Sequence, residues 1–167
     1  MTLLAITLAA PWSFAVVVLG KRIENRTWTD SRLEGGAYVA IHGGKTPPPG
    51  HSFKRKAMNA DVEWLATTPA WREHVGRRIE MQDYEGIVAV CKIGRVLKPN
   101  LEIHIGEQQV WRQMNQYAWE LTELEILPEP VKCSGKQGLW PVTGATLEQV
   151  REQVKRGRRA ELEAGAS

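Results

Sequence analysis

The segment from Pro11 to His42 constrains the fold of this chain more than any other feature. It opens on Pro-Trp and continues as an apolar stretch to Gly20, which is typical of a buried helix ended by a left-handed glycine. The stretch from Gly36 to His42 is apolar and is typical of a buried strand. Residues 21–28, Lys-Arg-Ile-Glu-Asn-Arg-Thr-Trp, lie between these two elements and are dense in charge. Because two buried elements hold this polar segment between them, we expect a functional site there.

Patterns along the rest of the chain predict further strands with helices inserted between them. Apolar or alternating stretches predict strands at residues 3–9, 23–28, 86–96, 101–105, 117–127 and 138–142. We expect the stretch 101–105 to pair with 86–96. Residues 52–78 predict one or two helical pieces, with a break at Pro69 and a cap at Thr67 or Thr68. Residues 43–51 are rich in proline and glycine and predict a loop.

A polar helix is predicted near the end of the chain, over residues 145–163. Its thin apolar stripe consists of Leu147, Val150, Val154 and Leu162. This helix either packs on the sheet or extends as a tail, so we divide the chain into a domain at residues 1–143 and a helix or tail at 144–167. Strands dominate the remainder. The expected fold class is therefore α+β, a mixed and partly open β-barrel with flanking helices and a C-terminal helix.

The charge of the chain permits a polyanionic partner without requiring one, because the net charge is only +3. Two groups of basic residues concentrate the positive charge. The first consists of Lys54, Arg55 and Lys56, and the second of Lys155, Arg156, Arg158 and Arg159. Each group is either a solvated face or a surface that contacts the phosphates of a nucleic-acid backbone.

Several kinds of site and compartment are not expected from the sequence. Cys91 and Cys133 form neither a metal-ligand spacing nor a disulfide framework, which favours a reduced, cytoplasmic protein. The four histidines, His42, His51, His74 and His104, share no ligand spacing, so we expect no metal and no other cofactor. The apolar residues near the N-terminus lack a basic leader and are too few to span a bilayer, so we expect neither a signal peptide nor a membrane partner.

Three residues of the polar segment and its flanking strand are the candidates for chemistry. Lys21 can bind a phosphate, or act as a base or nucleophile if burial lowers its pKa, unless it is only a surface lysine paired with Glu24. In an extended segment Glu24 would lie between Arg22 and Arg26 on one face, as an ion-paired carboxylate or a general base. His42 can hydrogen-bond a base or relay a proton, unless it is purely structural.

Aromatic and basic side chains nearby are the candidates for ligand binding. Trp12 and Trp28 can stack on a nucleobase or serve as packing. Lys45 and Lys136 lie in glycine-flanked stretches from which a side chain can reach a phosphate. We expect Trp12, Lys21 and His42 to line a single cavity together with Glu24, Arg26 and Trp28.

These residues resemble the opening of the ASCH domain family, a branch of the PUA-like superfamily of small β-barrels. The matching residues are Pro11-Trp12, Gly20-Lys21, Glu24, Arg26, Trp28 and Ile41-His42. A second match to the family lies in the segment that runs from Pro128 to Trp140, with its Gly-Lys-Gln-Gly-Leu-Trp ending. The chain departs from the family pattern at Ala10, where glutamine is usual, and at Glu34-Gly35-Gly36, where Arg-Gly is usual. The resemblance implies a PUA-like barrel.

The resemblance also implies a function in binding RNA or modified bases, so the expected partner is RNA, another single-stranded nucleic acid or a modified nucleoside. The alternative is a small hydrolase, either a ribonuclease or an amidohydrolase acting on acetylated cytidine. In such an enzyme Lys21, Glu24 and His42 would be the catalytic residues. Lys21 matches the amidohydrolase lysine, whereas Glu24 stands where threonine is expected and Lys92 lies in the strand that should carry a glutamate. A third possibility is a protein-interaction adaptor that uses the C-terminal helix, and nothing in the sequence indicates an oligomeric state.

Overall fold

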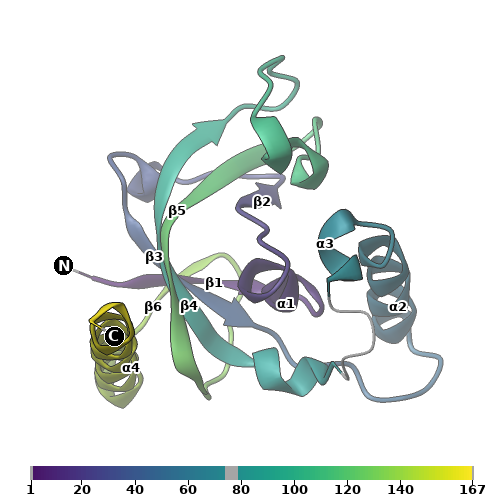
Figure 1. Cartoon of the computed structure of the whole chain (residues 1–167). Coiled ribbons are helices and arrows are strands. Elements are labelled where there is room, and N and C mark those ends of the chain that lie inside the picture. The colour runs from purple at the N-terminus through teal and green to yellow at the C-terminus, as the bar shows by residue number, and fades with distance from the viewer. Residues whose placement is uncertain (1, 74–78, 167) are drawn as a thin grey trace.

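The computed structural model describes residues 2–73 and 79–166 and shows an α+β fold built on one curled sheet (Figure 1). Its strands are β1 (Leu4–Leu8), β2 (Ile23–Arg26), β3 (Tyr38–Gly43), β4 (Gly86–Leu97), β5 (Tyr117–Val131) and β6 (Leu139–Pro141). Their order across the sheet is β2-β5-β4-β3-β1-β6. The pair β1 and β3 is parallel, and every other neighbouring pair is antiparallel.

The sheet curls into a half-barrel because its two longest strands are irregular. The ladder between β4 and β5 shifts register at three places, and the ladder between β3 and β4 shifts once. Such bulges bend a strand and increase its twist. Figure 1 shows the helix α1 (Trp12–Val17) inside the resulting curve. The predicted α+β class, with a partly open curled sheet and a C-terminal helix, is confirmed.

The helix α1 delivers the polar segment to the inside of the curve. Its Val16 side chain joins the main core on the sheet, whereas Phe14 packs between Trp71 and Tyr84 on the opposite side. The helix ends at Val17, two residues before the predicted end, and Gly20 has the predicted left-handed conformation with φ +72°. The N–H of Lys21 then donates to the Ala15 carbonyl at 3.1 Å, so the chain folds back toward the helix.

Two further helices, α2 (Phe53–Leu65) and α3 (Pro69–Arg72), lie beyond α1 at the open side of the half-barrel (Figure 1). The predicted break at Pro69 is confirmed. The hydroxyl of Thr68 accepts a hydrogen bond from the Trp71 N–H at 3.4 Å, so Thr68 is the cap. Residues 74–78 of the predicted helical segment, His74 included, lie outside the described residues.

The long helix α4 (Gly144–Gly165) covers the convex face of the sheet, on the side opposite α1 (Figure 1). Val150 is buried there against Leu127 and Val131, and Leu147 and Val154 pack beside it. The prediction was wrong for Leu162, which is 76 % exposed because it lies past the part of the helix that packs on the sheet. None of the described helices combines the length and hydropathy needed to cross a bilayer.

The prediction of a strand at 101–105 was wrong, because the sheet edge that it would need is occupied by β5. The segment is instead a loop that leads into the 3₁₀ helix η3 (Gly106–Trp111). The Arg112 guanidinium donates to the carbonyls of Leu101 at 2.5 Å and Ile103 at 2.6 Å, so a side chain takes the place of a strand ladder. Two other short 3₁₀ helices are η1 (Ser31–Leu33) and η2 (Met81–Tyr84). The other predicted strands are confirmed to within a few residues.

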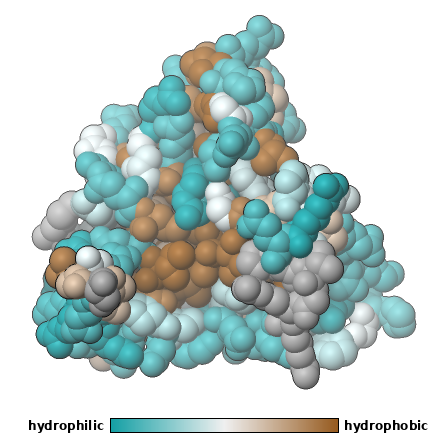
Figure 2. Space-filling view, viewed as in Figure 1, coloured by the Kyte–Doolittle hydropathy of each residue, from teal (hydrophilic) through white to brown (hydrophobic). Residues whose placement is uncertain are grey.

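The space-filling view shows apolar side chains gathered in the middle of this face of the molecule, with hydrophilic side chains around them (Figure 2). The main core lies between the sheet and α1 and includes Ile6, Ile41 and Trp119. Burial of each such side chain stabilises the fold by about 1.5–3 kcal/mol. The polar groups described below are therefore attached to a rigid apolar base.

Candidate functional site

Two adjoining cavities are lined in part by residues of the polar segment 21–28. The first pocket has a volume of about 570 Å³ and is lined by Leu8, Ala9, Trp12, Lys21, Glu24, Asn25, Arg26, Asp61, Trp64 and residues 110–113 and 116. The second pocket has a volume of about 910 Å³ and is lined by Thr7, Ala9, Arg26, Trp28, His42, Lys54 and residues 43–45, 85–86 and 132–138. Ala9 and Arg26 belong to both pockets.

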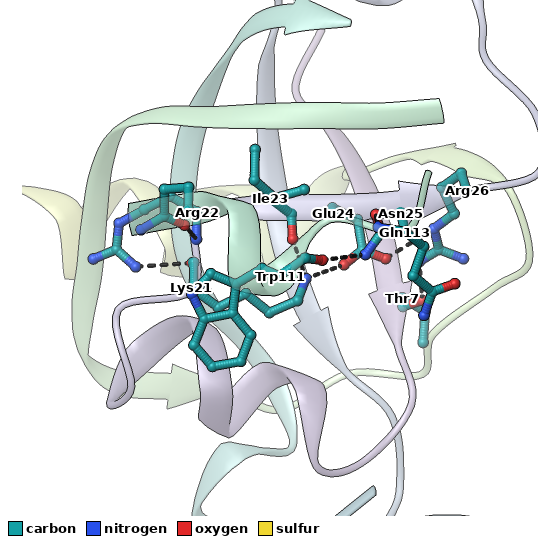
Figure 3. Close-up of polar contacts among 10 residues, drawn as sticks. Thr7, Lys21, Arg22, Ile23, Glu24, Asn25, Arg26, Trp111 and Gln113 are labelled. Atoms are coloured by element: carbon teal, nitrogen blue, oxygen red, sulfur yellow. Dashed lines mark hydrogen bonds and ion pairs between the residues drawn. The ribbon is translucent and has the colours of Figure 1, made fainter. Parts of the chain in front are cut away.

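A buried ion cluster forms one wall of the first pocket (Figure 3). The Lys21 ammonium donates to Oε2 of Glu24 at 2.8 Å and to the Ile23 carbonyl. Nε of Arg26 lies 3.0 Å from Oε1 of Glu24, in an ion pair whose geometry is too oblique for a hydrogen bond. Lys21 is 2 % exposed and Glu24 is 7 % exposed. Lys21 is therefore not a surface lysine, and its ammonium is oriented by a carboxylate that a second cation also contacts.

Arg22 does not lie beside Glu24, contrary to the alternation expected from the sequence. Its Nη1 donates to the carbonyls of Val16 at 2.8 Å and Lys21 at 3.0 Å. Because β2 begins at Ile23, Arg22 precedes the alternating part of the segment. Carbonyls left without partners at the end of α1 attract the guanidinium instead. The alternating pattern placed Arg22 beside Glu24, but in the structure the cation in that place is Lys21.

Three tryptophans form the aromatic walls of the first pocket. The ring centroids of Trp12 and Trp64 are 6.0 Å apart, and those of Trp64 and Trp111 are 5.8 Å apart. Nζ of Lys21 lies 5.8 Å from the centroid of the Trp12 ring, within range of a cation–π contact. Trp64 is 41 % exposed, which leaves a ring face for a ligand. Only Trp12 was identified from the sequence, because Trp64 and Trp111 reach the site through the docking of α2 and η3.

Asp61 lies on α2 one turn before Trp64 and also lines the first pocket. Burial raises the pKa of its carboxyl group, and a hydrogen bond with the Trp12 side chain partly opposes this shift. The pocket thus holds a carboxyl group that accepts a proton more readily than an ordinary aspartate. The i, i+3 spacing of Asp61 and Trp64 was the only signal for this residue in the sequence.

Two side-chain amides fix the outer wall of the first pocket. Nδ2 of Asn25 donates to the Trp111 carbonyl at 2.8 Å, and Oδ1 accepts from the Gln113 N–H at 2.9 Å (Figure 3). Gln108 likewise donates to the Gly20 carbonyl at 3.1 Å and accepts from the Arg22 N–H at 2.7 Å. These contacts attach η3 to the polar segment, and the sequence pattern did not reveal them.

His42 lines the second pocket and not the first, so the expected single cavity is replaced by two. Its Nε2 lies 3.0 Å from the Cys133 carbonyl and so carries the proton, whereas Nδ1 is buried without a hydrogen-bond partner. Burial lowers the pKa of His42. Gly135 lies so close to the ring that a Cβ there would be 2.7 Å from Nδ1. Lys21 and His42 therefore do not meet as an acid–base pair.

The second pocket is rich in basic side chains. Lys45, Lys54 and Lys136 line it, and Trp28 lines it with its ring packed edge-on against Trp119 at 5.2 Å. The Lys132 ammonium donates to the carbonyls of Gln82 at 3.2 Å and Glu85 at 3.1 Å. Lys132 thus braces the rim of this pocket.

Glu85 is the carboxylate of the second pocket within the described part of the chain. Its Oε1 accepts a hydrogen bond from the Thr46 N–H at 2.8 Å, and this bond lowers the pKa of Glu85. The carboxylate is therefore occupied in holding the loop after β3. The side chains of this pocket present positive charge to a ligand.

The two predicted basic groups do not act as units. In the first, Lys54 lines the second pocket and Arg55 donates to the Pro47 carbonyl at 2.9 Å, whereas Lys56 lines neither pocket. The second group lies on α4 and lines neither of these two pockets. There Arg156 pairs with Glu129 at 3.3 Å and Arg158 with Glu125 at 2.5 Å, while Lys155 and Arg159 are exposed.

Arg156 and Arg158 therefore link α4 to β5 through exposed ion pairs. The acidic residues of β5 that pair with them could not be matched to α4 from the sequence. Within residues 2–73 and 79–166, no group of three or more His, Cys, Asp or Glu side chains is arranged to hold a metal ion. Cys91 and Cys133 are both free thiols.

No protein-family model matches the chain, and no curated protein sequence matches it either. The resemblance to the ASCH family therefore stays a prediction that depends on the opening and closing motifs alone.

Proposed function

We propose that this protein binds single-stranded nucleic acid, RNA or a strand with a modified base in particular, and that one unstacked base enters the first pocket. The observation that carries the proposal is the combination of aromatic walls and oriented polar groups in one cavity. Its volume of about 570 Å³ lies within the range of about 300–1,000 Å³ that is usual for small-molecule sites.

The walls of the first pocket suit a flat heterocycle. Trp12 and Trp64 offer ring faces, and stacking on a base contributes about 1–3 kcal/mol. Asp61 and the side chains of Gln113 and Gln116 supply hydrogen-bonding groups around that space. Stacking combined with hydrogen bonding to base edges is the usual way in which proteins recognise single-stranded RNA.

The second pocket suits the backbone of the same strand. Lys45, Lys54 and Lys136 are exposed and line it beside Arg26. Lysine and arginine contacts with phosphates position a strand without reading its sequence. The likeness of Gly20-Lys21, Glu24 and the closing motif to the ASCH family supports the same function, since PUA-like proteins are largely readers of RNA or modified bases.

The test is the salt dependence of binding to a short single-stranded RNA oligonucleotide, followed by fluorescence anisotropy. We expect a Kd in the micromolar range. Added salt should weaken binding, and log Kd should rise with log salt concentration with a slope of about 0.7 for each phosphate contacted. The control is a duplex of the same sequence, whose stacked bases cannot enter the first pocket. The proposal would be ruled out if the Kd did not change with ionic strength, or if the duplex bound as tightly as the single strand.

A hydrolase is the second candidate, and Asp61 is the observation that favours it. Its carboxyl group, with a raised pKa, shares the first pocket with the Lys21–Glu24 pair. In an amidohydrolase reaction the Asp61 carboxylate would take a proton from the attacking water and then give it to the departing amine, while the Lys21 ammonium would stabilise the oxyanion that forms when water attacks the amide carbon. His42 lies in the other pocket and would take no part.

This second candidate is tested by incubating the protein with acetylated cytidine and, separately, with end-labelled RNA. Release of acetate that Asp61→Asn abolishes would establish an amidohydrolase, and shortened RNA would establish a ribonuclease. Unchanged substrates, together with retained RNA binding, would leave the binding function alone.

A further inference from the structure

We infer that the unit this protein recognises is a dinucleotide, in which the first pocket takes one base, the second pocket takes the neighbouring nucleotide, and Arg26 contacts the phosphate between them. The inference rests on the proposed function and adds a second nucleotide site to it. It follows from how the two pockets meet, from the side chains at their junction, and from the size and lining of the second pocket.

The two pockets meet at a low wall. Ala9 and Arg26 are the two residues that line both cavities. Ala9 contributes only a methyl group, so no bulky side chain stands there beside Arg26. A ligand that fills the first pocket can therefore continue into the second without leaving the protein surface. Two adjacent nucleotides of one strand have this form, with two rings joined by a short anionic link.

Arg26 is held in place to contact that link. Its Nη2 donates to the Thr7 carbonyl at 2.9 Å, and its Nε lies 3.0 Å from Glu24. A guanidinium group carries five N–H donors, so donors remain for a phosphate after these contacts. The side chain is 23 % exposed, which gives a ligand access to it. Because its orientation is fixed in advance, Arg26 loses little entropy when it binds a phosphate.

The second pocket is larger than a phosphate group requires. Its volume of about 910 Å³ exceeds that of the first pocket, and it contains the ring of Trp28 as well as basic side chains. Five cationic residues line it, namely Arg26, Lys45, Lys54, Lys132 and Lys136, against the single described carboxylate of Glu85. Glycines at 43, 44, 135 and 138 also line this pocket and place no side chains in it. Positive charge, a ring and open walls together suit a nucleotide.

The competing explanation is that the second pocket only attracts negative charge. The two explanations differ in how affinity depends on the charge and on the size of the ligand. A nucleoside 5′-monophosphate carries about −1.5 to −2 charges near pH 7. A dinucleoside monophosphate has a single phosphodiester and so carries less charge, but it has a second nucleoside. Attraction by charge alone favours the mononucleotide, whereas two nucleotide sites favour the dinucleotide.

The experiment compares these two probes by isothermal titration calorimetry at one salt concentration, in uridine and adenosine versions. We expect the dinucleoside monophosphate to bind at least tenfold more tightly. Ser134→Trp, which places a large side chain in the second pocket, should weaken dinucleotide binding more than mononucleotide binding and so remove this advantage. Asn59→Trp is the control, because residue 59 is exposed on α2 and lines neither pocket. Lys136→Ala, an exposed position, should reduce dinucleotide binding even if Ser134→Trp fails to fold.

Equal affinity for the two probes, or Ser134→Trp weakening both probes alike, would overturn the inference. The proposed function would survive that result if Trp64→Ala still abolished binding of the mononucleotide. If neither probe binds and the RNA oligonucleotide shows no salt-dependent binding, the proposed function itself fails.

Discussion

The two pockets hold similar charged residues but are built in opposite ways. In the first, Lys21 and Glu24 are buried and their partners are fixed at 2.8–3.0 Å. In the second, Lys45 and Lys136 are exposed on glycine-flanked loops. A buried pair has one geometry and a high cost of disruption, whereas an exposed lysine adapts its position at little cost. The first pocket is therefore suited to recognising one fixed shape, and the second to holding an anionic strand whose position can vary.

The largest expected effect is on the stability of the first pocket. Glu24→Gln leaves the buried Lys21 and the partly exposed Arg26 beside a neutral amide, and breaking a buried ion pair costs about 3–5 kcal/mol in the free energy of unfolding. Glu148→Gln removes the partner of Arg151 in an exposed ion pair with the same 2.8 Å distance and should cost at most about 1 kcal/mol. Urea denaturation measures both. Similar losses in the free energy of unfolding for the two variants would contradict the expected difference between buried and exposed ion pairs.

The next effect is on binding in the first pocket. Trp64→Ala removes a half-exposed ring, so we expect RNA affinity to fall by about 1–3 kcal/mol, or roughly 5- to 150-fold in Kd. Phe53→Ala is the matched control, because Phe53 lies on the same helix, is 86 % exposed and lines neither pocket. Fluorescence anisotropy of labelled RNA gives both values, and a Trp64→Ala variant that binds like the wild type would contradict a base site here.

A smaller effect concerns pH and the second pocket. Because burial lowers the pKa of His42 in the folded protein, the unfolded chain binds the proton more readily. The stability that His42 contributes is therefore complete above its ordinary pKa of about 6.5 and is lost as the pH falls through the lower folded-state value. The slope from this group is at most ~1.4 kcal/mol per pH unit.

His42→Gln tests this pH dependence, since glutamine can still donate to the Cys133 carbonyl and does not titrate. Urea denaturation between pH 7 and pH 5 should show a flatter profile for His42→Gln than for the wild type. His104→Gln, at an exposed histidine, should follow the wild type. Parallel profiles for the wild type and His42→Gln would show that the pKa of this imidazole is the same in the folded and unfolded protein, which would contradict the effect of burial.

The smallest expected effect separates two lysines on one helix. Lys54→Ala removes a cation from the second pocket, so RNA affinity should fall a few-fold and the salt slope should decrease by about 0.7. Lys56→Ala removes an equally exposed cation that lines neither pocket and should change neither quantity. Salt titrations of the two variants provide the measurement. Identical salt slopes for the two variants would mean that positive charge in general, and not this pocket, attracts the strand.

Local patterns predicted the parts of the fold that depend on neighbouring residues. Gly20, the break at Pro69 and most strands followed from local geometry, because turn chemistry and side-chain periodicity act over a few residues. The alternation through Arg22 failed because β2 begins one residue later. The strand expected at 101–105 failed because competition for a sheet edge is decided by the whole fold.

The candidate site could be predicted only in part for the same reason. Lys21, Glu24 and Arg26 lie within one short segment and were found from it. Asp61 and Trp111 join them through the packing of α2 and η3, which no local pattern encodes. His42 was assigned to the wrong cavity, because the segment around Cys133 and Gly135 encloses it from the far end of the chain.

The attachment of η3 by the amides of Asn25 and Gln108 has a consequence for how such a protein can diversify. One wall of the first pocket belongs to a loop that is joined to the sheet by four side-chain hydrogen bonds. The intervening positions between those anchors can be exchanged without rebuilding any strand. Ligand preference can therefore be re-engineered by substituting Val110, which lies between the anchors and lines the first pocket, while the sheet and its ion cluster remain intact.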